Sequence, residues 1–258
     1  MNLKNKKALI IGVASKRSIA TSIAEIFAKN GADIALTYQN DKLKSRVEDI
    51  AGSLETSENV LLHPCDLSND ADIAQLKLNI KDNWGNVDII IHSAAFAPRE
   101  LLNGDYVNNI TRDGFQIAHD ISSYSFTALA KEFRDIISPS GSMITLTYLG
   151  SERVIKNYNV MGLAKASLEA NVRYMSHSLG SSGIRVNAVS AEPIKTLAAA
   201  GISGFNEILK HVEDKAALKR NITLEEVANT ALFLASEQSS GITGQVIYVD
   251  GGFNISAV

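Results

Sequence analysis

The chain has 258 residues, of which 45% are hydrophobic and 21% charged, and its formal net charge is −3. A chain of this length can bury about three quarters of its unfolded surface, so a large core is available. The nearly balanced charge argues against a nucleic-acid partner, and no run reaches the roughly 18 apolar residues of a membrane span. Cys65 is the single cysteine, which excludes an internal disulfide and is typical of a reducing, cytoplasmic compartment.

Short apolar runs that alternate with helical segments predict the strands. The first run follows a lysine-rich opening and is too short for the core of a signal peptide. Most runs are continuously apolar, as in parallel strands that helices cover on both faces. We therefore expect an α/β fold, a doubly wound, Rossmann-like sheet of seven parallel strands with helices on both faces. The runs are Lys7–Ile11, Asp33–Tyr38, Val60–Cys65, Val87–His92, Ser142–Tyr148, Arg185–Ser190 and Gln245–Asp250.

Helical patterns fill the segments between these runs. The first helix is expected over Ser18–Asn30 and ends at Gly31, a residue suited to a left-handed helix terminus. Further helices are expected at Asn69–Ile80, Arg112–Ile136, Tyr158–Leu179 and Thr223–Ser236. The chain has no linker, low-complexity tract or repeat, so residues 1–258 are expected to form one domain. Residues 191–218 have the least regular pattern and are expected to form a flap over the site.

The turn after the first strand lies where nucleotide-binding folds hold a pyrophosphate. It contains one glycine, Gly12, and lacks the G-x-G-x-x-G fingerprint, so an ordinary strand-loop-helix connection remains an alternative. Backbone N–H groups at a helix N-terminus can still bind an anion, and the hydroxyls of Ser15 and Ser18 add donors.

Gln39 ends the second strand, where dinucleotide-binding proteins often carry an acidic residue for the ribose. A neutral amide with no arginine immediately beside it favours NADH over NADPH, while Lys42 and Lys44 leave NADPH open. The third strand leads to Asp66, which could accept from the adenine amino group or cap the following helix.

Tyr158 and Lys165 carry the most informative spacing. Seven residues at about 100° each return almost to the same face of a helix, about 10 Å along its axis. Both side chains would then face one groove and could bind opposite sides of a nicotinamide ribose. The ammonium would favour an electron-rich phenol, and the hydroxyl could stabilise an oxyanion.

Along nearly its whole length the chain resembles the short-chain dehydrogenase/reductase superfamily, and specifically the bacterial enoyl-acyl-carrier-protein reductases. The strings that carry the resemblance are Thr37–Lys44, Ala118–Phe126 and Asn157–Tyr174. It implies NADH-dependent reduction of the 2,3-double bond of an enoyl thioester on acyl-carrier protein, in fatty acid elongation. It also implies a homotetramer in which the Arg112–Ile136 and Tyr158–Leu179 helices pair across subunits.

The resemblance also implies the site. Tyr158 and Lys165 match the catalytic pair, and Tyr148 matches a tyrosine that lines the substrate pocket and could assist protonation. Ala97 matches a substrate contact. The positions that match cofactor contacts are Gly12, Ser18, Ile19, Gln39, Asp66, Leu67, Ser93, Ala94, Lys165, Ile194, Lys195, Thr196, Leu197 and Ala198. Among these, Ile19, Leu67 and Ile194 would pack in the same way without a ligand.

Two positions depart from the family's usual sequence. Ala94 replaces an isoleucine beside the nicotinamide, and Glu192 replaces the glycine of Ser-Ala-Gly-Pro. If that glycine has a left-handed backbone, Glu192 would cost about 1–2 kcal/mol. Its carboxylate would stand near the cofactor, and Glu192→Gly would then tighten NADH binding or raise turnover.

Other classes fit less well. The five histidines show no metal-ligand spacing, so no metal is expected, and the serines of 122–125 lack the G-x-S-x-G elbow of a hydrolase. A ketoacyl or alcohol reductase stays open, because Thr145 or Thr147 could supply the serine hydroxyl that such enzymes use. A catalytically weak NADH-binding sensor also stays open, because of Glu192.

Overall fold

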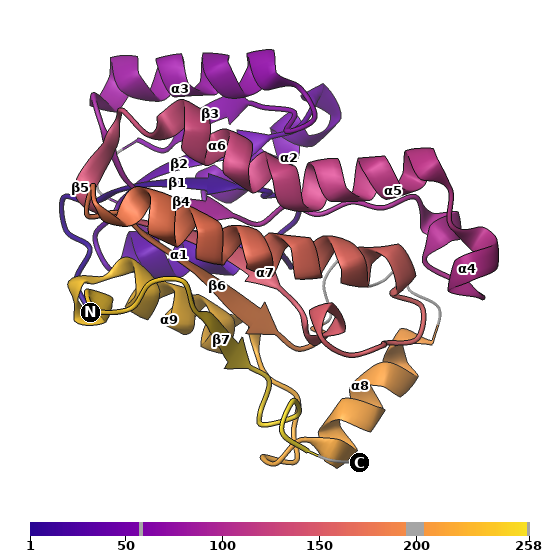
Figure 1. Cartoon of the computed structure of the whole chain (residues 1–258). Coiled ribbons are helices and arrows are strands. Elements are labelled where there is room, and N and C mark those ends of the chain that lie inside the picture. The colour runs from indigo at the N-terminus through magenta and orange to yellow at the C-terminus, as the bar shows by residue number, and fades with distance from the viewer. Residues whose placement is uncertain (57–58, 195–203, 257–258) are drawn as a thin grey trace.

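The computed structural model describes residues 1–56, 59–194 and 204–256, and these residues contain the expected parallel sheet (Figure 1). Its seven strands have the order β3-β2-β1-β4-β5-β6-β7. The strands up to β3 are added on one side of β1, and those from β4 onward are added on its other side, so the strand order reverses between β1 and β4. At such a point, open α/β sheets bind ligands beyond the carboxyl ends of their strands. The strands are β1 (Lys7–Ile11), β2 (Asp33–Tyr38), β3 (Leu61–Pro64), β4 (Val87–His92), β5 (Ile137–Thr147), β6 (Arg185–Ala191) and β7 (Val246–Val249).

Alternate residues of each strand feed two cores, one on each face of the sheet. On β1, for example, Ile10 packs with α1 (Ile19–Lys29), α2 (Asp41–Ala51) and α9 (Leu224–Ala235). Leu9 packs on the other face with α3 (Asp70–Trp84), α6 (Ser125–Phe133) and α7 (Asn159–Gly180). Figure 1 shows α3 and α6 above the strands and α1 and α9 below them. Burial on both faces explains why the strand sequences are continuously apolar.

The helix expected over residues 112–136 is interrupted. It consists of α5 (Arg112–His119), a π-helical turn over Asp120–Tyr124, and α6. Inside the turn, the Ser122 hydroxyl donates to the Phe96 carbonyl (3.1 Å) and accepts from the Phe96 N–H (3.0 Å). These bonds tie the turn to the loop after β4, which explains why regular helix was the wrong prediction here.

Among the described residues, three α-helices lie outside the ranges predicted from the sequence, and α2 is one of them. The short α4 (Tyr106–Asn109) precedes α5, and α8 (Phe205–Lys215) lies within the segment that we expected to be the least regular. Among the residues that the structure describes, no helix combines the length and apolarity needed to cross a membrane.

Buried Arg185 joins the sheet to the end of α9. Its guanidinium donates to the carbonyls of Leu234 (2.8 Å) and Ser236 (3.2 Å) and to the Ser239 hydroxyl (2.8 Å). A cation at a helix C-terminus satisfies free carbonyls and is favoured by the helix dipole. The bond network thereby fixes the position of α9 beside β6.

Candidate active site

The predicted site residues after β1 and β4 meet at the sheet reversal. Gly12 has a φ of 97°, and a Cβ there would lie 2.1 Å from the carbonyl oxygen of Ser93. Only glycine permits both the backbone conformation and the close approach. Gly12, Ser93 and Ala94 are therefore brought together, as the sequence predicts.

The turn between β1 and α1 has hydroxyl donors without a complete set of partners. Ser18 is the N-cap of α1 and accepts from the Thr21 N–H (3.1 Å). The Thr21 hydroxyl donates to the Ser15 carbonyl (2.7 Å), so the Ser18 hydroxyl is the donor in its 2.9 Å contact with the Thr21 hydroxyl. A bound anion would accept this hydrogen bond from Ser18 in place of Thr21. The Ser15 hydroxyl is buried and has no partner within the described part of the chain. This donor set at a helix N-terminus fits the pyrophosphate of a dinucleotide.

Gln39 and Asp66 lie in contact beyond the ends of β2 and β3. The Gln39 amide donates to Asp66 Oδ2 (3.3 Å), and Ser68 donates to Asp66 Oδ1 through its N–H (3.0 Å) and hydroxyl (2.8 Å). Burial raises the pKa of Asp66, but the hydrogen bonds from Ser68 and Gln39 outweigh it, so the net pKa is lowered. Asn69, not Asp66, caps α3, so the alternative role considered for Asp66 is wrong.

Arg46 was missed in the sequence because it lies several residues beyond Gln39 on α2. It donates to the carbonyl of Ala14 (3.1 Å), which brings a cation to the turn after β1. The helical pattern of α2 could not show that the side chain of Arg46 extends to the turn at the end of β1.

Tyr158 immediately precedes α7 rather than lying inside it. The residues on either side, Asn157 and Asn159, have positive φ angles of 62° and 33°. Asparagine tolerates such a conformation better than most residues, and strained backbone of this kind clusters at functional sites. The expectation that Tyr158 and Lys165 lie on one regular helix is therefore wrong, because Tyr158 is the N-cap of α7 and only Lys165 lies within the helix.

Lys165 is buried with its Nζ donating to the Leu146 carbonyl (2.8 Å). Burial lowers the pKa of Lys165 to about 8, and the charge of Glu169 acts in the opposite direction. Burial also raises the pKa of Tyr158, with smaller contributions from Tyr148 and Glu169. Near neutral pH, Tyr158 is thus a neutral hydrogen-bond donor.

The two site tyrosines are in direct ring contact. Their centroids are 5.0 Å apart with an interplanar angle of 84°, an edge-to-face pair. Burial, followed by the charge of Glu192, raises the pKa of Tyr148 to about 12. Tyr158 also packs against an apolar cluster that contains Ala97 and Met161. The structure thus brings Tyr148, Tyr158 and Ala97 to one wall, as the resemblance implies.

His92, at the end of β4, is fully buried and bridges to two hydroxyls. Ser125 donates to the Ile121 carbonyl (2.7 Å), so it accepts from His92 Nε2 (2.8 Å). His92 Nδ1 is then an acceptor for the Thr145 hydroxyl (2.9 Å). Burial and the charge of Lys165 lower the pKa of His92 to about 3, which agrees with this neutral tautomer.

The aliphatic candidates have packing partners of their own. Leu67 is buried in the core that contains α3, while Ile19 and Ile194 are half-buried against the core on the other face. Lys195, Thr196, Leu197 and Ala198 lie outside the described residues. Within the described ranges, no group of three or more His, Cys, Asp or Glu side chains could hold a metal ion.

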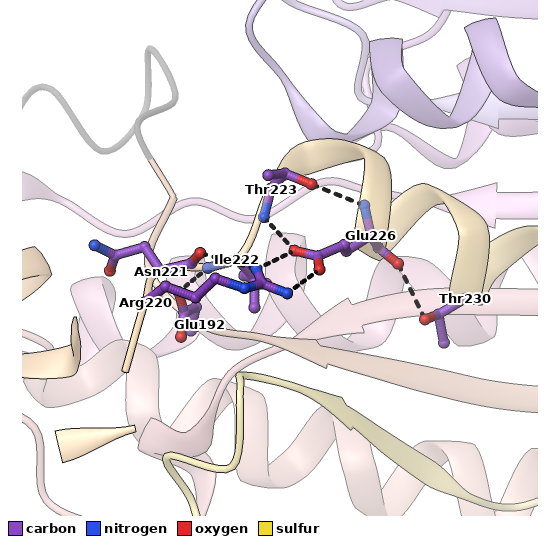
Figure 2. A network of polar contacts seen from close by, with 7 residues as sticks. All are labelled: Glu192, Arg220, Asn221, Ile222, Thr223, Glu226 and Thr230. Carbon is purple, nitrogen blue, oxygen red and sulfur yellow. Dashed lines mark hydrogen bonds and ion pairs between the residues drawn. The ribbon is translucent and has the colours of Figure 1, made fainter. Parts of the chain in front are cut away.

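The backbone of Glu192 does not have the left-handed conformation that we considered for it. Its φ is not positive, and its N–H continues the sheet by donating to the Val249 carbonyl (3.2 Å). The side chain, 3% exposed, accepts a 2.5 Å hydrogen bond from the Ile222 N–H just before α9 (Figure 2). Nearby, Arg220 forms a bidentate pair with Glu226, whose carboxylate completes a capping box with Thr223. The carboxylate of Glu192 therefore ties the end of β6 to the start of α9.

Burial raises the pKa of Glu192 to about 7, because the effect of burial and of Asp250 and Glu226 exceeds that of the Ile222 N–H and Arg220. Glu192 Oε2 has no partner among the described residues. A folded-state pKa above the ordinary value of 4.5 means that this group stabilises the fold most below that value. The contribution is lost as the pH rises through about 7.

We expect Glu192→Gly to lower the free energy of unfolding by about 1–2 kcal/mol, because the Ile222 N–H loses its acceptor. Glu192→Gln keeps an acceptor and cannot ionise, so its advantage over the parent should grow between pH 5 and pH 8. Urea unfolding of the three proteins at both pH values measures this. Equal stability of parent and glycine variant, or parallel pH curves for parent and glutamine variant, would contradict the assignment.

Comparisons with known proteins agree with the geometry. A family profile described as enoyl-(acyl carrier protein) reductase matches residues 12–254. The NADH-dependent enoyl-[acyl-carrier-protein] reductase of Salmonella typhimurium is 53% identical over 99% of this chain and 97% of its own length. The Bacillus cereus enoyl-acyl carrier protein reductase, solved with NADP+ and an indole naphthyridinone, superposes with a TM-score of 0.97 at 45% identity, covering 100% of both chains. The Anaplasma phagocytophilum reductase, solved with NAD, gives 0.94 at 39% identity, covering 99% of this chain and 96% of that one. The chain belongs to the enoyl-acyl-carrier-protein reductase family.

Proposed function

We propose that this protein uses NADH to reduce the 2,3-double bond of an enoyl thioester carried by acyl-carrier protein, a step of fatty acid elongation. The observation that carries the proposal is the edge-to-face contact of Tyr148 with Tyr158 beyond the end of β5, the strand whose Leu146 carbonyl accepts from buried Lys165. The membership of the family supports the reaction, and the name of the Salmonella typhimurium relative includes NADH.

The residues after β1, β2 and β3 would hold the cofactor. Gly12, Ser15 and Ser18 would bind the pyrophosphate through N–H groups and hydroxyls. Gln39 would bind the adenosine ribose, and the neighbouring Asp66 carboxylate would accept from the adenine amino group. An anionic Asp66 beside Gln39 also disfavours a 2′-phosphate, which supports NADH over NADPH.

The nicotinamide end would lie near β4, β6 and α7. Ser93 and Ala94 would flank the ring, and Lys165 would donate to the ribose hydroxyls. The aliphatic residues Ile19, Leu67 and Ile194 would pack against the cofactor. Bound NADH supplies the hydride.

In the reaction, Tyr158 would donate a hydrogen bond to the thioester oxygen, on which negative charge collects as the β-carbon is reduced. The raised pKa of Tyr158 keeps the donor protonated. Lys165, as a cation, would stabilise the charge that builds near the phenol. Tyr148 and Ala97 would form the wall against which the acyl chain packs.

The alternative ketoacyl reductase lacks a free hydroxyl at the threonines considered for it. Thr145 donates to His92, and Thr147 donates to Glu169 (2.6 Å). A catalytically weak sensor loses its support as well, because Glu192 has ordinary backbone and faces Ile222.

We also propose a homotetramer, a cytoplasmic location and a single domain over residues 1–258. The flap expected over residues 191–218 falls largely on residues 195–203, which lie outside the described ranges. Exposed apolar side chains on α5, the π-helical turn and α7 support the assembly, since such surfaces mark interfaces. They are Phe115, Ile117, Tyr124, Leu163 and Tyr174.

The direct test follows NADH absorbance with two substrates. We expect rapid oxidation with crotonyl thioester of acyl-carrier protein and little with acetoacetyl thioester, because neither Thr145 nor Thr147 has a free hydroxyl to assist a ketone. Preferential use of acetoacetyl thioester, or no oxidation with either substrate, would refute the proposed reaction.

Tyr158→Phe isolates the proposed donor. We expect kcat to fall by about 10²–10³-fold with little change in NADH affinity, because the hydrogen bond strengthens only as charge develops. Steady-state rates and calorimetric titration of NADH measure the two effects. A near-normal kcat would remove Tyr158 from the mechanism.

Gly150 sets the position of the Tyr158 ring. A Cβ at Gly150 would lie 2.4 Å from Tyr158 Cδ1, so Gly150→Ala must displace the ring. A shift of about 1 Å in a reacting group can cost about 10²-fold in rate, and we expect a loss of this order in kcat. Gly180→Ala, at a position with nothing within 4 Å of the added carbon, is the matched control and should leave kcat unchanged. Equal rates for both variants would show that the ring position is not critical.

A further inference from the structure

The α7 helix carries a second buried charge that the sequence did not single out. Glu169 is four residues after Lys165, a spacing that puts both on one face of the helix, and each side chain is 6% exposed. The Thr147 hydroxyl donates to Glu169 Oε1 (2.6 Å), and Lys165 Nζ donates to the Leu146 carbonyl (2.8 Å). The two charged groups are therefore anchored to consecutive residues of β5.

In the described part of the chain, Glu169 and Lys165 form no salt bridge with each other. Among residues 1–56, 59–194 and 204–256, neither Glu169 nor Lys165 belongs to an ion pair within 4 Å. Burying a charge is costly unless an opposite charge or hydrogen bonds offset the lost solvation. Each side chain has one hydrogen bond to β5, so the remaining compensation must come through space.

The titratable groups that face this pair come from β4, from the residue before α7, and from β7. From β4, neutral His92 lies on the Lys165 side and is disfavoured as a cation by Lys165. Burial raises the pKa of Tyr158, before α7, and Tyr148 and then Glu169 raise it further. Burial raises the pKa of Tyr248, on β7, and Glu152 raises it further, followed by Glu169 and Asp250. Burial lowers the pKa of Lys165 to about 8, and Glu169 is the group that opposes this.

We propose that Glu169 is a positioning residue whose carboxylate, fixed by Thr147, keeps Lys165 cationic where the Leu146 carbonyl holds it at the end of β5. The inference rests on the proposed function for its catalytic consequence. Without the carboxylate, Lys165 loses its proton at a lower pH. A neutral amine binds the ribose more weakly and no longer stabilises negative charge at Tyr158.

The test uses Glu169→Gln in the full-length protein, because glutamine keeps an oxygen for Thr147 and removes the charge. At pH 6, NADH affinity and kcat/KM should remain within about twofold of the parent. An opposite charge nearby moves a pKa by about 1–3 units, so the alkaline limb of both profiles should shift down by about one pH unit or more. At pH 8.5 the loss should reach about tenfold. Glu225→Gln, an exposed residue of α9, changes the net charge equally and should leave both limbs in place.

A double-mutant cycle gives a readout that needs neither NADH nor turnover. Thermal unfolding at pH 7 is compared for the parent, Glu169→Gln, Lys165→Met and the double variant. The loss of melting temperature caused by Lys165→Met should be smaller in the Glu169→Gln background, because the carboxylate is then no longer left unpaired. A parent that fails to reduce enoyl thioesters but shows this coupling would refute the proposed function and leave the charge pairing standing.

Two results would overturn the inference. One is a loss of activity by the same factor at every pH with unmoved limbs, which indicates a structural role alone. The other is additivity in the cycle. If Glu169→Gln does not fold, Thr147→Val removes only the hydroxyl that fixes the carboxylate. That variant should shift the same alkaline limb down by a smaller amount, and an unmoved limb would equally overturn the inference.

Discussion

The backbone of Gly12 lies directly against the carbonyl of Ser93, with no room for a side chain between the ends of β1 and β4. This approach occurs where the strand order reverses, so it determines the width of the crevice at that point. The turn that follows Gly12 leads to the N-cap of α1 and its incompletely partnered serines. The strand paired with β4 on its other side, β5, ends beside Tyr148. The proposed pyrophosphate-binding turn and the end of β5 that carries Tyr148 thus both lie next to strands that meet at the contact of Gly12 with Ser93.

A second constraint is electrostatic, since the interior around α7 contains more polar groups than an ordinary core. His92, Lys165 and Glu169 are all buried there. Each is held by hydrogen bonds to hydroxyls or carbonyls of neighbouring strands and helices. In a medium of low effective dielectric, such groups influence one another over longer distances than they would in water. The protonation state of Tyr158 therefore depends on residues that do not touch the proposed substrate.

The strands and most helices could be predicted because their signal is local. An apolar run of five residues, such as Lys7–Ile11, reports its own burial on both faces. Spacing along the chain singled out Tyr158 and Lys165, and positions at strand ends singled out Gly12, Gln39 and Asp66, but the resemblance supplied most of the other site residues. The contact of Gln39 with Asp66, and the reach of Arg46 to the turn after β1, depend on how separate strands are aligned, which no local pattern contains.

Two expectations about the site were wrong, namely a strained backbone at Glu192 and a regular helix that includes Tyr158. The backbone of Glu192 could not be inferred from a glycine in relatives, because glycine also occupies ordinary conformations. Its carboxylate accepts a hydrogen bond from the N–H of Ile222, which is 30 positions away in the sequence. For Tyr158, helical spacing was extended one residue past the true helix start, where two asparagines impose a turn. Glu169 was detectable in principle, since a carboxylate four residues after Lys165 shares its face.

The π-helical turn between α5 and α6 has a consequence for how this chain can change in length. Such a turn accommodates an extra residue within a helix, and it directs Ser122 to Phe96. Because the wide turn absorbs that residue, α5 and α6 keep their packing faces on either side of it, and Phe126 and Phe133 remain fully buried. Removing one residue of the turn would restore regular helix without rotating α6 away from the core. It would instead withdraw the hydrogen bonds between Ser122 and Phe96, so the link to the loop after β4 is what the extra residue provides.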